Sequence, residues 1–165
     1  MSSTARLRVP FLAAGQAQKE FFHNEALQTL DLLVAAAVEE APRDWPPGSP
    51  VLGQCYIVGS APTGIWTGRE QCLAAFTSGG WRFITPFEGV SALIRSTKNC
   101  ATYVAGVWEL GIVRAAKVVI AGQQVVGGRL AGIASSSGGT IVDTQARSTL
   151  DQILTAMRQH GLIET

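Results

Sequence analysis

The sequence predicts an α+β protein with an N-terminal helix, a central antiparallel β meander or small barrel, and a C-terminal helix behind a Gly/Ser tether. Three observations support this prediction. A pattern of small residues, an aromatic residue, a glycine turn and a tryptophan occurs twice, at residues 72–83 and 100–110. Short apolar runs punctuated by glycines fill residues 51–128, which is typical of short antiparallel strands. Apolar residues at helical spacing lie on both sides of this region.

The repeated pattern indicates two β-hairpins, because in each copy a glycine turn separates two strand-like runs. The first copy reads CLAAFTSGGWRF and the second CATYVAGVWEL. We expect Trp81 and Trp108 at equivalent positions, holding both hairpins on one core, with Phe83 and Tyr103 beside them. The strands of the central β domain are expected near residues 54–58, 71–77, 81–85, 90–95, 100–104, 107–112, 117–121 and 124–127.

An extended arm and a helix are expected ahead of the β domain. Residues 1–23 form the arm, because Pro10 favours extended backbone before it; such an arm either packs on a neighbouring subunit or frays. Residues 24–41 form the helix, with Asn24 as the N-cap and Pro42 as the stop signal. The apolar face of this helix, a candidate interface for self-association or docking, comprises Leu27, Leu30 and Val34.

A second helix is expected at the C-terminal end. Residues 129–142 are rich in serine and glycine and predict a flexible tether. Residues 143–165 follow as a helix, with Asp143 as its N-cap and Gly161 at the left-handed C-terminal position. Its apolar stripe packs on the same domain or bundles with copies of itself, and both alternatives remain open. The interface candidates on this stripe are Leu150, Ile153, Leu154 and Met157.

Four stretches of the chain carry a family resemblance. They read AGQAQKEFFHNEALQTLDLLV from residue 14, PGSPVLGQCYIV from residue 47, APTGIW from residue 61, and residues 138–163. In these stretches the chain resembles domain-of-unknown-function family 2793, uncharacterised proteins of alphaproteobacterial prophages and gene transfer agents. Glu20 and Gln54 depart from the family pattern, which usually has a histidine and an acidic residue there. The resemblance implies a virion-associated protein.

Composition excludes several classes of function. A chain of 165 residues suits one domain with a helical appendage, and a net charge of +1 gives no reason to expect nucleic acid as a partner. No apolar run approaches the about 18 residues of a membrane span. The three cysteines form no metal-ligand pattern, and no nucleotide fingerprint occurs, so neither metal nor cofactor is expected. We expect a cytoplasmic protein, and the family resemblance implies that it is cytoplasmic during assembly and then part of a virion or gene-transfer-agent particle.

Aromatic residues are the leading candidates for ligand contact, because exposed rings stack on the apolar faces of sugars. Exposure is expected for Trp66, which lies in the turn-rich TGIWTG segment, and the other candidate glycan contacts are Trp45 and Tyr56. The alternative is that these rings form the core of a domain with few large aliphatic residues.

Catalytic groups are sparse. Glu70 and Glu88 are the one carboxylate pair that could cleave a glycoside if the fold brought them to a suitable separation. The two histidines, His23 and His160, are explained by helix capping or exposure. We therefore expect no catalytic residue.

The sequence thus favours a non-enzymatic structural subunit of a phage-like particle, such as a head spike, fibre or tail accessory protein. It would form homo-oligomers, dock on capsid or tail proteins, and have host capsular polysaccharide as a candidate ligand. An independent carbohydrate-binding module and, more weakly, a polysaccharide hydrolase are the alternatives.

Overall fold

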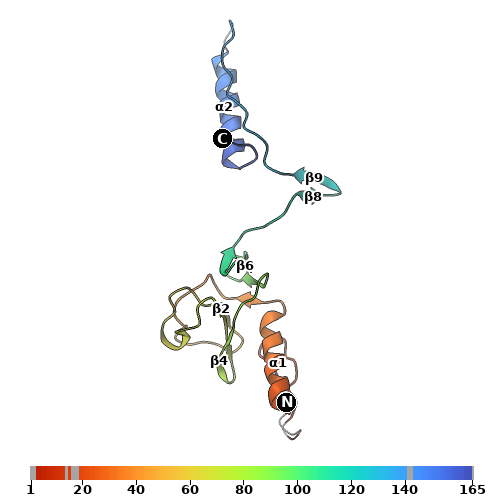
Figure 1. The fold of residues 1–165 in the computed structure, drawn as a ribbon, viewed down its shortest axis with the longest axis vertical. Helices are drawn as coiled ribbons and strands as arrows, with labels where there is room; N and C mark the ends of the chain where they lie inside the picture. Colours follow the sequence, from red (N-terminus) through yellow and green to blue (C-terminus); the bar gives the residue numbers. More distant parts are fainter. Residues whose placement is uncertain (1–2, 14, 16–18, 141–142, 165) are drawn as a thin grey trace. The chain divides into compact units, whose positions relative to one another are not determined.

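The computed structural model describes residues 3–13, 15, 19–140 and 143–164. The chain divides into two units, residues 1–112 and 113–165, which we describe separately (Figure 1). The first unit contains α1 (Lys19–Leu33), β1 (Ala37–Val38), β2 (Cys55–Ile57), the 3-10 helix η1 (Gly64–Trp66), β3 (Leu73–Thr77), β4 (Gly80–Ile84), β5 (Ser91–Ile94), β6 (Cys100–Val104) and β7 (Val107–Leu110). The second contains β8 (Val118–Ile120), β9 (Gln123–Val126) and α2 (Thr144–Gln159).

The α+β prediction is confirmed, but the described strands form separate open sheets instead of a closed barrel. In the first unit, one sheet has the order β2-β3-β4 and the other the order β1-β5-β6-β7. Every pair is antiparallel except that of β1 with β5, which is parallel. The remaining sheet is the β8–β9 hairpin of the second unit.

Both tryptophan hairpins are present, and their registers are equivalent. Trp81 of β4 lies opposite Phe76, and Trp108 of β7 lies opposite Tyr103. In the β6–β7 turn, Ala105 and Gly106 both have positive φ, which matches the right-handed twist of a two-residue hairpin. The hairpins belong to different sheets, however. The expectation of one shared core is wrong, because Trp108 belongs to one buried cluster while Trp81 and Phe83 pack against another.

The larger cluster is the core between the two sheets of the first unit. The β2-β3 side contributes Cys55, Ile57, Leu73 and Ala75, and the opposite sheet contributes Ala92, Ile94, Ala101 and Trp108, with Tyr103 packed against the cluster. The other face of β2 and β3 carries Tyr56, Val58 and Ala74, which are buried in the second cluster. Since these strands are covered on both faces, they read as continuous apolar runs without polar alternation.

The N-terminal arm folds back on α1 and is not an extended arm over its whole predicted length. The amide N–H of Thr4 donates to the carbonyl of Val9, which closes a turn. The Arg6 guanidinium donates to the backbone carbonyls of Asp31, Leu32 and Ala35 at the C-terminal end of α1. The Asp31 carboxylate in turn accepts the amide N–H groups of Arg6 and Leu7. The arm therefore caps α1 of its own chain.

The boundaries of α1 differ from the predicted residues 24–41. Asn24 lies inside the helix, where its side chain exchanges hydrogen bonds with the backbone N–H and carbonyl of Leu12, so it does not act as the N-cap. The helix ends at Leu33 because Ala35 takes a left-handed conformation and Val38, which is fully buried, pairs with β5. Predicted arm residues 19–23 belong to the helix, whereas residues 1–2, 14 and 16–18 lie outside the described part.

In the second unit, α2 has the caps that the sequence predicts. The Asp143 carboxylate accepts the amide N–H of Ala146, and Gly161 takes φ 70° while Leu162 donates to the Met157 carbonyl. The domain boundaries differ from the predicted ones, since β8 and β9 belong to this unit. Predicted tether residues 129–140 run beside α2, where Arg147 and Arg158 donate hydrogen bonds to their carbonyls. Leu130 and Ile163 form an isolated parallel β-bridge. No helix in the described ranges is long and apolar enough to cross a membrane.

We predict that Arg6→Ala destabilises the first unit by about 2 kcal/mol, because it leaves carbonyls at the end of α1 without their charged donor. All four tryptophans lie in this unit, so urea denaturation followed by tryptophan fluorescence reports its unfolding. Arg8→Ala, an exposed change of the same type two residues away, is the matched control and should have little effect. Equal denaturation midpoints for the two variants would contradict the capping role.

Candidate functional site

Trp66, the leading candidate for glycan contact, is not exposed. Its side chain has 0% relative exposure because η1 turns it inward against the second buried cluster. The Trp81 ring lies perpendicular to it with a centroid separation of 5.1 Å, and the Tyr56 ring lies 5.8 Å away. Tyr56 is buried as well. The predicted exposure of Trp66 is wrong, and the candidate contact Tyr56 is also inaccessible, because the turn around Trp66 closes over the face of β2 and β3.

Trp45 is the one predicted glycan contact that reaches the surface, with 58% exposure. It lies in the proline-rich loop between β1 and β2, and the Arg43 guanidinium is 5.2 Å from the centroid of its ring. Arg43 is itself held by Glu40, with 2.5 Å between Nη1 and Oε1. One face of the Trp45 ring therefore makes a cation–π contact with Arg43.

A polar cleft of about 520 Å³ lies beside the edge strand β4. We call it the β4-edge cleft, and its lining includes Glu25 and Gln28 of α1, Arg69, and Trp81, Arg82 and Phe83 of β4. Because successive residues of a strand alternate between faces, Trp81 and Phe83 lie on one side of β4 and Arg82 on the other. The cleft is therefore lined both by the half-buried rings of Trp81 and Phe83 and by the polar side chains of Arg82, Glu25 and Gln28.

The electrostatics of the β4-edge cleft centre on Arg82. Its two terminal nitrogens donate to the two carboxylate oxygens of Glu25 at 2.5 and 2.6 Å, and its Nε donates to Gln28 Oε1 at 3.0 Å. These hydrogen bonds lower the pKa of Glu25, so the carboxylate stays ionised. Arg69 is exposed, and its guanidinium lies 5.2 Å from the centroid of the Phe83 ring. The cleft therefore combines a fixed ion pair with a second arginine at its surface.

Sequence reasoning missed the β4-edge cleft, although one signal was present. Arg82 stands between Trp81 and Phe83 in a strand with no other charged residue, and such a charge needs a partner from another element. The partners Glu25 and Gln28 are three residues apart on α1, and therefore on one face of the helix. Only the fold shows that this face meets β4.

The carboxylates considered for glycoside cleavage have separate surroundings. Glu70 is exposed in the turn before β3, whereas the Glu88 carboxylate accepts the amide N–H of Ala105 in the β6–β7 turn. His23 is exposed on α1 and His160 is the C-cap residue of α2.

Burial raises the pKa of the Cys55 thiol to about 11. None of the His, Cys, Asp and Glu residues in the described ranges form a group of three or more that could hold a metal ion.

The predicted association surfaces lie on α1 and α2. Near the first helix, Leu30 and Val34 are about half exposed, while Leu27 is more covered. On α2, Leu150 and Ile153 are each 50% exposed, and Leu154 and Met157 are partly covered. Both apolar faces are available to another molecule, and their role as interfaces stays a prediction.

Comparison with known proteins gives one family. Residues 23–109, more than half of the chain, match the model of a family described as "Protein of unknown function (DUF2793)". The matched range runs from α1 through most of β7, and it includes the whole lining of the β4-edge cleft. The search of curated proteins found no significant match.

We predict that Trp66→Ala lowers the free energy of unfolding of the first unit by about 3–5 kcal/mol, because it empties a fully buried aromatic site. The control is Trp45→Ala, which removes an exposed tryptophan and should leave the stability close to that of the wild type. Urea denaturation followed by far-UV circular dichroism compares the two. A stable, fully folded Trp66→Ala variant would contradict the burial of this ring.

Proposed function

This chain belongs to the DUF2793 family of proteins of unknown function, and we propose that it is a non-enzymatic structural subunit of a phage-like particle or gene transfer agent. It serves there as a head spike, fibre or tail accessory protein. It is made in the cytoplasm, self-associates through its apolar helix faces, and docks on capsid or tail proteins of the particle.

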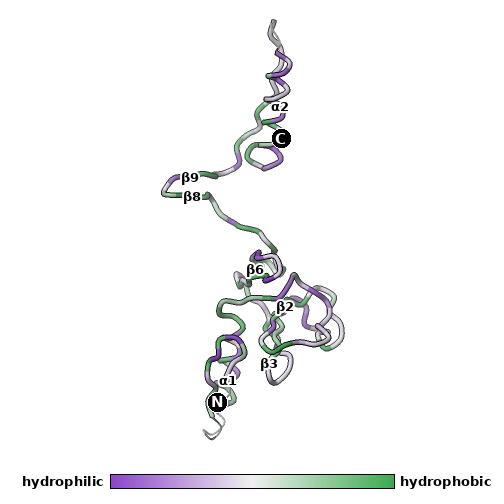
Figure 2. The backbone as a smooth tube through the Cα atoms, turned by 180° about the vertical axis from the view of Figure 1, so that it is seen from behind, coloured by the Kyte–Doolittle hydropathy of each residue, from purple (hydrophilic) through white to green (hydrophobic). Residues whose placement is uncertain are grey.

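The observation that carries this proposal is the contrast between the two units. The first unit has a buried core of its own, which joins two sheets and the end of α1. In the described part of the second unit, Ile163 is the only buried side chain, while the valines and isoleucines of β8 and β9 are about half exposed. Figure 2 shows hydrophobic residues along the β8–β9 part of the chain. Since burial of apolar surface is the main driving force of folding, this contrast supports an assembly in which neighbours cover the second unit.

The sequence supports the same assignment. The segments that resemble prophage and gene-transfer-agent proteins lie in the first 66 residues of the first unit and in the second unit, so the resemblance extends beyond the matched residues 23–109. A charged fraction of 15% in a chain that is 47% hydrophobic also suits a protein whose apolar surface is covered by neighbours.

We predict that the protein co-sediments with nuclease-resistant particles from producing cells. The particles are purified on a density gradient, and immunoblots of each fraction compare this protein with the capsid protein and with a cytoplasmic enzyme. Co-migration with the capsid protein is the expected result. Confinement of the protein to the fractions of the cytoplasmic enzyme would contradict the proposal.

The β4-edge cleft favours a second candidate function, carbohydrate binding, either on the particle or as an independent module. Its half-buried aromatic rings offer apolar faces to a sugar, and the Arg69 and Gln28 side chains offer hydrogen-bonding groups to its hydroxyls or carboxylate. Host capsular polysaccharide is the corresponding ligand. The Arg82–Glu25 ion pair holds two of the side chains that line the cleft in fixed positions, so they need not be ordered when such a ligand binds.

We predict that Arg69→Ala reduces retention of the protein on immobilised capsular polysaccharide about tenfold, which corresponds to the loss of roughly one good polar contact. The control is Lys98→Ala, which removes the same charge from an exposed site of the first unit that does not line the cleft. The polysaccharide should retain this variant as well as it retains the wild type. Affinity electrophoresis measures the retention. Equal retention of both variants, or none for the wild type, would rule out the cleft as the glycan site.

A further inference from the structure

The second unit has strong local signals but almost no packing. Asp143 and Gly161 cap α2 at its two ends, so the helix is well defined by its own sequence. A lone helix of 16 residues is nevertheless marginal in water, and so is a lone two-stranded hairpin such as β8–β9. The contacts described within this unit therefore leave most of its apolar side chains without a partner.

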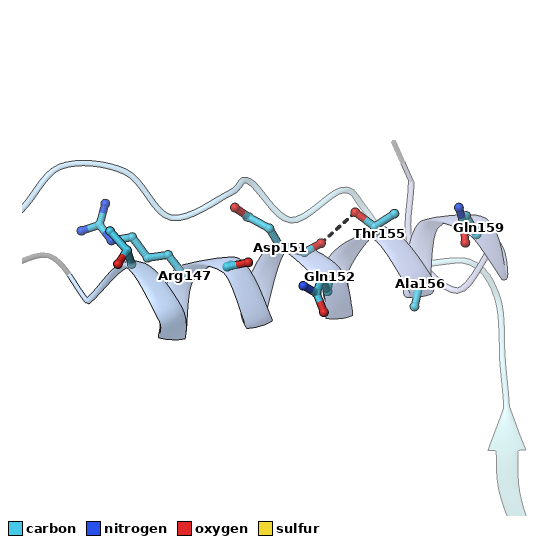
Figure 3. Close-up of a pocket in the computed structure, with 8 residues that line it drawn as sticks. Arg147, Asp151, Gln152, Thr155, Ala156 and Gln159 are labelled. Atoms are coloured by element: carbon cyan, nitrogen blue, oxygen red, sulfur yellow. Dashed lines mark hydrogen bonds between the residues drawn. The ribbon is translucent and has the colours of Figure 1, made fainter.

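One side of α2 is already occupied within the chain. The Arg147 guanidinium donates to the carbonyl of Gly138, and the Arg158 guanidinium donates to the carbonyl of Ile133. Both acceptors belong to the extended segment 129–140 that runs beside the helix (Figure 3). Arg147 and Arg158 are 11 residues, or about three turns, apart and so lie on one face of α2.

A second side of α2 is polar. Ser148, Gln152, Thr155 and Gln159 line a shallow pocket there, together with Arg147 and Asp151 (Figure 3). The Thr155 hydroxyl donates to the backbone carbonyl of Asp151, which is a bond within the helix. The side chains that line this face include no large apolar group, so the face calls for no apolar partner.

The remaining side of α2 is apolar and forms what we call the α2 seam, consisting of Ala146, Leu150, Ile153 and Met157. Leu150 and Ile153 are each 50% exposed. At about 100° per residue, the α2 seam lies opposite the polar face. The three charged residues of α2, Arg147, Asp151 and Arg158, all lie off the seam.

The spacing of the α2 seam is that of a coiled coil. Its residues are separated by four, three and four positions, which places Ala146 and Ile153 at d positions and Leu150 and Met157 at a positions of the heptad. Leucine at a with isoleucine at d favours three- or four-stranded parallel bundles over dimers. We propose that the α2 seam assembles three or four copies of this chain in parallel, each seam packing on the same residues of its neighbours.

A second copy is the occupant that fits best. An a/d seam is self-complementary, since identical helices in register place knobs and holes at matching heights. The seam carries no charge that would call for a partner of opposite sign. The exposed β8–β9 hairpin gives each copy a second apolar element to bury in the same assembly. The inference rests on the proposed function, because it takes the partner of α2 to be another copy of the subunit.

Light scattering coupled to size exclusion tests the stoichiometry on the full chain at tens of micromolar. The expected mass is three or four times that of the 17.4 kDa subunit. Leu150→Asp should reduce it to one subunit. Gln152→Asp, which adds the same charge on the polar face, should keep the wild-type mass. Tryptophan fluorescence verifies that the first unit stays folded in both variants. A monomeric wild type, a dimer, or a Leu150→Asp variant of wild-type mass would overturn the proposal.

Oxidative cross-linking tests the parallel register. In a Cys100→Ser background, which removes the exposed native thiol, Ile153→Cys should form a covalent dimer on oxidation, because identical seam positions come within disulfide reach. Gln152→Cys in the same background is the control and should remain a single chain. Failure of Ile153→Cys to cross-link while the oligomer mass persists would overturn the parallel arrangement.

The two proposals fail independently. If the purified chain keeps its oligomer mass but is missing from particles, the proposed function is wrong and the proposed assembly through the α2 seam is retained. If the protein is found in particles but its purified chain is monomeric, the α2 seam is wrong and the particle assignment stands.

Discussion

The first unit depends on one buried side chain that joins its two sheets. The Trp108 indole of β7 lies in the main core, and its Nε1 donates to the carbonyl of Gln71, in the turn before β3, at 2.8 Å. Gln71 takes a left-handed conformation, which is uncommon for a residue other than glycine. The bond satisfies the one polar atom of a large buried ring, so the core can close without a buried unpaired donor at this position. The two tryptophan hairpins are thereby fixed to each other although they belong to different sheets.

This arrangement also determines which strand of the smaller sheet has an open edge. With β2 and β3 covered on both faces, the open edge strand β4 is where aromatic and charged side chains come together. The Arg82–Glu25 ion pair then ties β4 to α1 and forms the wall of the β4-edge cleft. Trp66 is fully buried and packs on Trp81, which lines the cleft.

The second unit follows a different logic. Its helix caps and hairpin turn are encoded locally, as in any stable domain, but its described apolar side chains are almost all exposed. The contacts described within this unit therefore leave most of its apolar surface uncovered. The division of the chain therefore separates a unit with a buried core from a unit whose described residues bury almost no apolar side chain.

The sequence by itself determined the elements whose signals are local. The α+β class, both tryptophan hairpins and the caps of α2 follow from turn glycines, capping residues and periodicity within a few positions. The boundaries of α1 and the environment of Trp66 did not follow. Val38 leaves the helical pattern because it pairs with β5, more than 50 residues later, and Trp66 is buried because Trp81 lies over it. Only the tertiary structure decided such features, since burial depends on contacts between residues far apart in the chain, which no local pattern contains.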